Sequence, residues 1–188
     1  MDWLSTIIGA AIGFVSSVGI IVSERLIDRA GIVKVYARIV YQQTTNPTSW
    51  GFDDGQGEIY LKVPVWLELE NLSNAPRVVR DVNLVLFNRT ERVAEMVQIN
   101  RRGTGEHAQI FGNNGGYSFV LEPRSIQRYE CFYSLKQDLQ KSEVFDRIKL
   151  RYYDEKDKEH LLLLGKVDGD WSVKEFPRSA KWIKLKKK

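Results

Sequence analysis

The sequence has few of the residues that build catalytic and metal centres. Among 188 residues there are one cysteine, Cys131, and two histidines, His107 and His160, so a zinc site with several His or Cys ligands cannot form. The phosphate-binding loop, the G-x-S-x-G nucleophile turn and the H-E-x-x-H zinc motif are also absent. We therefore expect a protein that is not an enzyme and that holds no metal or cofactor.

Charge is missing from a long stretch near the start of the sequence. Residues 3–22 contain no charged residue and no proline. A helix of this length rises about 30 Å, the thickness of the hydrocarbon core of a bilayer. We expect an N-terminal transmembrane α-helix, with Trp3 as an interfacial anchor. Two alternatives stay open: a secretory signal peptide, although Met1-Asp2 supplies no cationic leader, and an apolar helix buried in the domain.

Cations flank this apolar stretch on one side only. None precedes it, whereas Arg25, Arg29, Lys34 and Arg38 follow it. Because cationic flanks stay on the cytoplasmic side, this asymmetry predicts a single-pass protein of the inner (plasma) membrane, with the N-terminus outside and the C-terminal domain in the cytoplasm. The lone Cys131 agrees with a reducing compartment, since it has no partner for an intrachain disulfide.

Small residues recur every four positions along the predicted span and share one helix face. Such a stripe, which includes a G-x-x-x-G motif, lets helices approach closely in a bilayer. We expect a homo-oligomer in contact with membrane lipid, in which two acidic residues just after the span ring the mouth of a pore. An ordinary membrane helix followed by a solvated turn is the alternative. The predicted helix-packing and pore residues are Ser5, Gly9, Gly13, Ser17, Glu24 and Asp28.

The rest of the chain shows the alternation of β-strands. From Glu58 to Glu70 the odd positions are apolar and the even ones mostly polar, which predicts a strand with one face in a core. Pro64 within it predicts an edge strand or a bulge, because proline cannot donate to a ladder. We expect further strands over 32–42, 77–87, 94–100, 117–122, 126–133, 146–153, 160–164 and 171–176, a short helix over 136–144, and surface loops over 42–57 and 101–116.

This succession of short strands predicts a mainly β fold. The expected architecture is an immunoglobulin-like β-sandwich preceded by the one N-terminal transmembrane α-helix. Residues 1–30 would form the helix and a juxtamembrane turn, 31–176 the cytoplasmic β-sandwich domain, and 177–188 a basic C-terminal tail. The tail could lie against anionic lipid, hold nucleic acid or be solvated.

Arginine and lysine positions predict an anionic-ligand site. Three cations in the strand near residue 150 share one face at a spacing of about 6.6 Å, similar to that of phosphates in an extended nucleic-acid strand. Two adjacent arginines stand at the base of a glycine-rich loop, and outward-facing Tyr60 and Trp66 could stack on bases. Solvated strand faces are the alternative. The predicted ligand residues are Arg101, Arg102, Arg147, Lys149 and Arg151.

These features support competing hypotheses about function. The first is an oligomeric membrane effector whose N-terminal helices form a gated ion channel, controlled by a ligand on the sandwich. The second is a membrane-tethered sandwich that binds a protein partner and has no channel activity. An anchored hydrolase is the weakest hypothesis, because catalytic motifs are absent.

The layout resembles the single-span transmembrane effectors of bacterial anti-phage defence, in particular the Hailong type. The resemblance lies in the uncharged N-terminal stretch at residues 3–22, the β-rich body and the arginine-rich surface. It implies a channel whose cytoplasmic part binds single-stranded DNA that holds the channel gated. The expected ligand is then a single-stranded nucleic acid or oligonucleotide, with a protein partner as the alternative.

Overall fold

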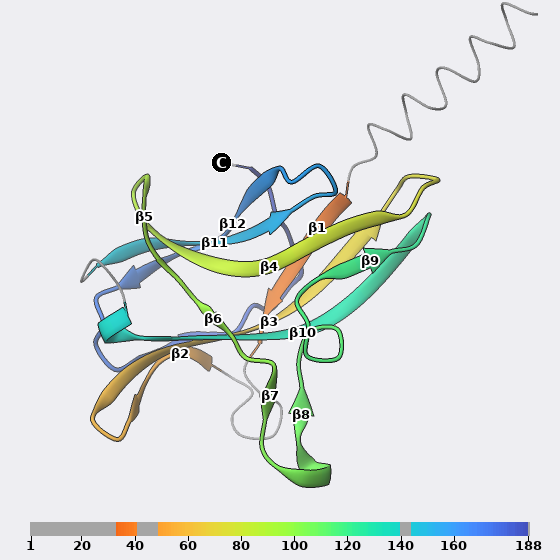
Figure 1. Ribbon diagram of the computed structural model, residues 1–188. Coiled ribbons are helices and arrows are strands. Elements are labelled where there is room, and N and C mark those ends of the chain that lie inside the picture. Colours follow the sequence, from red (N-terminus) through yellow and green to blue (C-terminus); the bar gives the residue numbers. More distant parts are fainter. Residues whose placement is uncertain (1–32, 41–48, 140–143, 188) are drawn as a thin grey trace, which may run out of the picture.

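Two packed antiparallel β-sheets form the body of the protein (Figure 1). This computed structural model describes residues 33–40, 49–139 and 144–187. In the first sheet the order is β13 (Lys174–Pro177), β2 (Ser49–Gly55), β3 (Glu58–Asn71), β1 (Val33–Ile39) and β14 (Ile183–Lys184). The same sheet includes β10 (Ser125–Lys136), which pairs with the other side of β3 and with β6 (Val97–Gln98). In the second sheet the order is β12 (Glu159–Gly169), β11 (Phe145–Tyr153), β4 (Arg77–Asn88) and β5 (Glu91–Glu95), and β9 (Phe119–Leu121) pairs with the beginning of β4.

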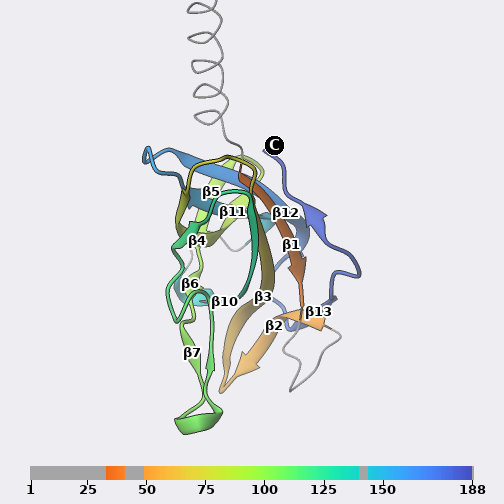
Figure 2. The same cartoon turned by 90° about the vertical axis from the view of Figure 1, so that its right-hand side faces the viewer.

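A small hairpin projects from the sandwich (Figure 1 and Figure 2). It consists of β7 (Arg101–Arg102) and β8 (Gln109–Ile110), joined through the 3-10 turn η1 (Gly105–His107). The hairpin occupies part of the glycine-rich segment that was expected to be a loop. Phe111, directly after β8, is buried with its ring 5.3 Å from that of Phe132 on β10. This contact fastens the base of the hairpin to the first sheet.

The core lies between the two sheets, and β3 supplies its middle. The odd positions of β3 point inward, as the alternation predicted, and share a buried cluster with side chains of β4 and β11. Burying an aliphatic side chain contributes about 2 kcal/mol, so this one strand is a large part of the driving force for folding. Its fully buried side chains are Leu61, Val63, Val65, Leu67 and Leu69, each at most 1 % exposed.

Strand β3 is central and regular, so the prediction of an edge strand or a bulge at Pro64 is wrong. β10 pairs continuously along one side of β3, while the other side pairs with β2 at residues 58–62 and with β1 at residues 65–71. Pro64 therefore lies at the junction between β1 and β2. Its carbonyl accepts a hydrogen bond from the Val40 amide at 3.0 Å on that side. In a strand, the N–H and C=O groups of one residue point to the same side. The N–H that Pro64 lacks would therefore also have pointed to this junction, between β1 and β2.

Three segments differ from the sequence prediction. Residues 49–55 form β2 and not a loop, because Trp50 and Phe52 are buried. The strand expected over 94–100 is divided: β5 belongs to the second sheet, β6 to the first, and buried Met96 marks the crossing. The helix expected over 136–144 is wrong within the described residues, where β10 continues to Lys136 and only the 3-10 turn η2 (Gln137–Leu139) follows.

The C-terminal segment packs along one edge of the sandwich. β14 pairs with β1, and the Leu185 amide donates to the Val35 carbonyl at 2.9 Å. One residue further, an isolated bridge joins Lys186 to Leu163 of β12, so the segment links both sheets. Leu185 is buried there. Backbone hydrogen bonds to both sheets and the buried Leu185 side chain thus hold a segment whose composition predicts a basic tail.

The predicted transmembrane helix lies outside the described residues. The same holds for all the predicted helix-packing and pore residues, Ser5, Gly9, Gly13, Ser17, Glu24 and Asp28. In the described part of the chain, no helix is long and apolar enough to cross a membrane. β1 begins at Val33, at the same end of the sandwich as the β11–β12 hairpin and the C-terminal end (Figure 1 and Figure 2).

Candidate functional site

A pocket of about 350 Å³ opens at the end of the sandwich where β1 begins. We call it the terminal pocket. It is formed by the start of β1, the start of β4, the β11–β12 hairpin and the segment around β14. Its apolar lining includes Val33, Val35, Leu162 and Leu185, and its polar lining comprises Lys34, Arg77, Tyr152, Asp154, Glu155, Lys156, His160, Lys184 and Lys187. The pocket therefore combines an apolar wall with many charged groups.

Asp154 organises the β11–β12 turn beside this pocket. Its Oδ1 accepts hydrogen bonds from the amides of Lys156 (2.9 Å) and Lys158 (3.1 Å), and its Oδ2 lies 2.7 Å from His160 Nε2. Burial favours a higher pKa for the carboxyl group, but the hydrogen bonds with His160 and the two amides outweigh it, so the pKa of Asp154 lies below its ordinary 3.8. The His160 ring stacks on Tyr152 with 4.6 Å between ring centres, which fixes the imidazole.

Asp154→Ala is expected to lower the free energy of unfolding by about 1–2 kcal/mol at neutral pH, because two backbone amides and His160 lose their acceptor. Since the folded-state pKa of Asp154 is depressed, its carboxylate stabilises the fold above about pH 4, and this contribution disappears as the pH falls through the folded-state pKa. Urea unfolding followed by tryptophan fluorescence should show the wild-type and variant stabilities approaching each other in acid. A difference that is constant from neutral pH to about pH 3 would contradict this role.

The charges that line the terminal pocket do not cancel. Arg77, with its side chain 9 % exposed, pairs with Glu155 and donates to Ser73 Oγ at 3.2 Å. The other acidic lining residue, Asp154, is engaged by His160. Within the described part of the chain, no carboxylate lies within ion-pair distance of three lysines in the lining, Lys156, Lys184 and Lys187. The pocket therefore carries a positive potential.

A second surface lies on the outer face of the first sheet. We call it the arginine–tryptophan face, and it consists of Arg38, Trp66, Arg128 and Trp182. Trp66 on β3 is partly exposed, with the guanidinium of Arg38 5.9 Å and that of Arg128 5.4 Å from its ring centre. The Arg128 guanidinium also lies 5.3 Å from the ring of Trp182. Cations and aromatic faces at these distances attract each other, so the groups order one another.

Both arginines of this face are held by further contacts. Arg38 Nε donates to the Ser179 carbonyl at 3.2 Å. Arg128 donates two hydrogen bonds to Glu68 Oε1, at 3.1 and 2.8 Å. In the described residues no carboxylate pairs with Arg38, so its charge is uncompensated at short range. The face thus offers two ordered tryptophan rings together with guanidinium groups that can donate hydrogen bonds.

Two of the cations predicted on β11 also have protein contacts. Arg147 pairs with Asp146 at 3.4 Å and donates to the carbonyl of Arg89. The Lys149 ammonium lies 4.4 Å from the ring centre of Phe87 on β4. Both side chains are only partly buried. Anion binding at Arg147 and Lys149 stays a prediction.

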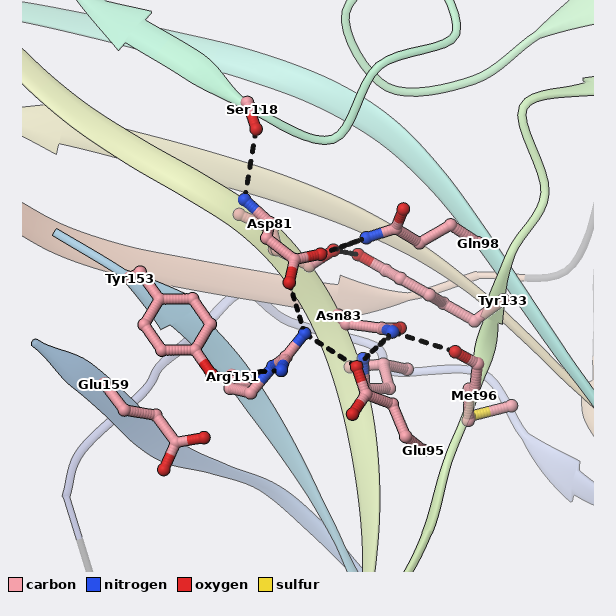
Figure 3. A network of polar contacts seen from close by, with 12 residues as sticks. Asp81, Asn83, Glu95, Met96, Gln98, Ser118, Tyr133, Arg151, Tyr153 and Glu159 are labelled. Atoms are coloured by element: carbon pink, nitrogen blue, oxygen red, sulfur yellow. Dashed lines mark hydrogen bonds and ion pairs between the residues drawn. The ribbon is translucent and has the colours of Figure 1, made fainter. Parts of the chain in front are cut away.

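Arg151, the third cation of β11, lies at the centre of a polar network (Figure 3). Its side chain is 8 % exposed, and its Nη2 lies 2.6 Å from both Asp81 and Glu95. Asn83 donates to Glu95 at 2.9 Å, and Gln98 donates to Asp81 at 3.0 Å, which orients both carboxylates. The expectation that Arg151 presents its charge to a ligand in solvent is therefore wrong, because carboxylates from β4 and β5 enclose it.

The two arginines predicted near the glycine-rich loop lie on the projecting hairpin. Arg101 and Arg102 are exposed, and Arg101 donates to the Gly105 carbonyl at 3.3 Å. The hairpin lies well away from β11 in both views (Figure 1 and Figure 2). The structure therefore does not bring the two predicted groups of cations together into one site.

The alternation of β3 in the sequence indicates an outward-facing Trp66 but does not show which residues surround it. Arg38 stands directly opposite Trp66 across the β1–β3 ladder, and Arg128 stands opposite Glu68 across the β10–β3 ladder. The available signal was the alternation of β1 and β10, in which both arginines occupy outward positions. In the described residues, no group of three or more His, Cys, Asp or Glu side chains could hold a metal ion.

Two antiparallel sheets over one core, with strands that cross between them, define an immunoglobulin-like domain. Residues 33–164 match the family model described as the YopI Ig-like domain. The chain belongs to this family, and the predicted mainly β, immunoglobulin-like fold is confirmed. Comparisons with curated proteins and with solved structures gave no match.

Proposed function

We propose that this protein is a non-enzymatic, membrane-anchored effector of the inner membrane, in which the immunoglobulin-like domain is the receptor. Its N-terminal segments would self-associate in the bilayer and form a pore, and a single-stranded oligonucleotide on the cytoplasmic domain would control that pore. One observation carries the receptor part: Trp66 lies partly exposed between the guanidiniums of Arg38 and Arg128.

The arginine–tryptophan face suits single-stranded nucleic acid in two respects. Every base has a flat face that stacks on an aromatic ring, with a contribution of about 1–3 kcal/mol per base. Guanidinium groups add cationic donors that match phosphate oxygens. The preordering of both arginines reduces the entropy lost when a ligand binds. The near balance of acidic and basic residues, 24 against 28, favours this local site over a uniformly basic surface.

The position of this face supports a coupling to the N-terminal segment. Arg38 belongs to β1, the strand that follows residues 1–32. Seven residues of β1 pair with β3, the strand that carries Trp66. A ligand across the face would therefore contact the strand that continues into the predicted membrane segment.

Arg128→Gln is expected to weaken binding of a labelled single-stranded DNA about fivefold and to lower the salt dependence of binding by about one released ion. Trp66→Ala should weaken binding about tenfold, and Trp66→Phe less, because it keeps an aromatic face. Fluorescence anisotropy of the full chain in detergent, over a range of salt concentrations, measures both effects.

Arg92 offers a matched control for Arg128. It is also an exposed arginine with one carboxylate partner, Glu159 at 2.7 Å, but it lies on β5 of the other sheet. Arg92→Gln should leave the affinity unchanged. Equal losses at Arg92 and Arg128, or binding that is indifferent to salt, would refute the oligonucleotide site.

A membrane-tethered module that binds a protein partner is the second candidate. The projecting hairpin favours this candidate. It stands clear of the sandwich in both views (Figure 1 and Figure 2), and Ile110 on its strand β8 is 58 % exposed. Large apolar side chains exposed on a protruding element suit protein recognition. In that case Ile110→Ser would disrupt the complex, and the variants of Trp66 and Arg128 would not.

A further inference from the structure

The terminal pocket has features of a binding site that the oligonucleotide proposal does not use. None of its lining residues belongs to the arginine–tryptophan face. Its volume of about 350 Å³ falls in the range of small-molecule sites. Four separate parts of the chain meet there, so no single element explains the cluster by its own pattern.

Three lysines give the pocket its charge. Lys156 comes from the β11–β12 turn, Lys184 from β14, and Lys187 from the segment after β14. Among the described residues these ammonium groups have no carboxylate within ion-pair distance. Three like charges around one concavity repel each other, so an anion that enters the pocket relieves this repulsion.

The other charged side chains of the lining are already paired, Lys34 with Glu70 at 3.3 Å among them. Glu155 is taken by Arg77, whose side chain is largely buried, and Asp154 is held by His160 and two backbone amides. These carboxylates therefore oppose an incoming anion less than free ones would. The pairs also hold the β11–β12 turn in place, which positions Lys156 at the pocket.

We propose that the terminal pocket binds a phosphate monoester or diester attached to a small organic body. A phosphate monoester carries a charge of about −1.5 to −2 near neutral pH, more than the single negative charge of a carboxylate ligand, and therefore suits a pocket lined by several ammonium groups. The apolar lining of Val33, Val35 and Leu162 suits the organic part. Two sources share this chemistry: a soluble phosphate ester and the headgroup of an anionic phospholipid.

Occupancy of the pocket would bear on the beginning of β1. Val33, Lys34 and Val35 are lining residues, and they directly follow residues 1–32. A ligand would also bridge β1 to the β11–β12 turn of the other sheet. Binding is therefore expected to stabilise this end of the domain.

Isothermal titration of the full chain in a neutral detergent tests the proposal with two probes, glycerol 3-phosphate and dihexanoyl phosphatidylglycerol. The wild type should bind at least one probe. The double variant Lys156→Glu/Lys187→Glu should weaken that binding by about tenfold or more, because two attractive contacts become repulsive. Tighter binding of the short-chain lipid identifies a headgroup as the source, and tighter binding of glycerol 3-phosphate identifies a soluble ester.

The same turn and tail supply a matched control. Lys158→Glu/Lys186→Glu makes the same change of net charge at exposed neighbours that do not line the pocket, and its affinity should stay within about twofold. Equal losses in both double variants, or no binding of either probe to the wild type, would overturn the proposal. Thermal unfolding verifies that each variant is folded, and Lys156→Gln/Lys187→Gln replaces the charge reversal if the latter is not.

Discussion

Arg151→Ala is expected to lower the free energy of unfolding by about 2–3 kcal/mol, the largest stability loss from any single cation on β11. The Arg151 guanidinium lies between Asp81 and Glu95, and its removal leaves these two carboxylates facing each other. Asp81 is 51 % and Glu95 39 % exposed, so solvent screens part of the repulsion and keeps the loss below that of a fully buried pair.

Urea unfolding of the full chain in detergent, followed by tryptophan fluorescence, measures this loss. Arg147→Ala is the matched control, because Arg147 lies four residues before Arg151 on the same strand. The Arg147 side chain is 29 % exposed, and its ion pair with Asp146 is longer, at 3.4 Å. This substitution should cost less than about 1 kcal/mol. Adding Glu95→Gln to Arg151→Ala should recover part of the stability by relieving repulsion. Similar losses for Arg147→Ala and Arg151→Ala would contradict the structural role of Arg151.

This role changes how ligand binding is tested. Reversing the charge of Arg151 would place a third carboxylate next to Asp81 and Glu95, so a loss of binding would report a damaged fold. Arg128 is not enclosed between two carboxylates in this way, because its side chain is 53 % exposed on the outer face of the first sheet. Substitutions there report on the surface itself.

Gly9→Leu/Gly13→Leu is expected to abolish the growth arrest and membrane leakage that follow expression of the wild-type chain. Both residues lie outside the described part of the structure, and the prediction depends on their spacing in the sequence. Leucine side chains on this stripe would keep neighbouring helices apart, and viable counts should rise on the order of 100-fold. Plate counts and dye uptake in induced cells measure the effect.

Ala11→Leu is the matched control for the helix stripe. Position 11 lies about 200° around a helix from position 9, so the added bulk would face away from the predicted contact. Cells that express this variant should leak like wild type. If the double variant Gly9→Leu/Gly13→Leu and the control Ala11→Leu leaked equally, the pore would not depend on close packing of this stripe. If expression of the wild-type chain left cells intact, the channel proposal would be wrong and the tethered module would be favoured.

The sandwich was predictable where a strand faces both core and solvent. β3 alternates strictly, and its buried residues are those that the alternation assigned to the core. β2 was missed because Gly51, Asp53 and Asp54 are poor strand formers; the strand exists because Trp50 and Phe52 are buried and because β3 and β13 pair with it. Tertiary pairing decided that segment, and local composition could not show it.

The candidate site was less predictable because charge compensation is a tertiary property. Alternation correctly put Arg151 and Trp66 on outer faces, but the partners of Arg151 stand 56 and 70 residues earlier in the chain, at Glu95 and Asp81. Nothing in the local pattern distinguishes a cation that is enclosed from one that is available. The same holds for Arg38, whose place beside Trp66 depends on the register of β1 against β3.

The way β1 is seated determines how the domain would respond to mechanical load. β1 pairs with β3 over seven residues on one side and with β14 on the other. A pull on the residues before Val33, directed along β1, would load these hydrogen bonds in parallel, as a shear, and not one after another as in peeling. The domain would then move as a rigid body together with that segment. At higher load the pairing of β1 with β14 would separate first, because it is shorter than the pairing of β1 with β3.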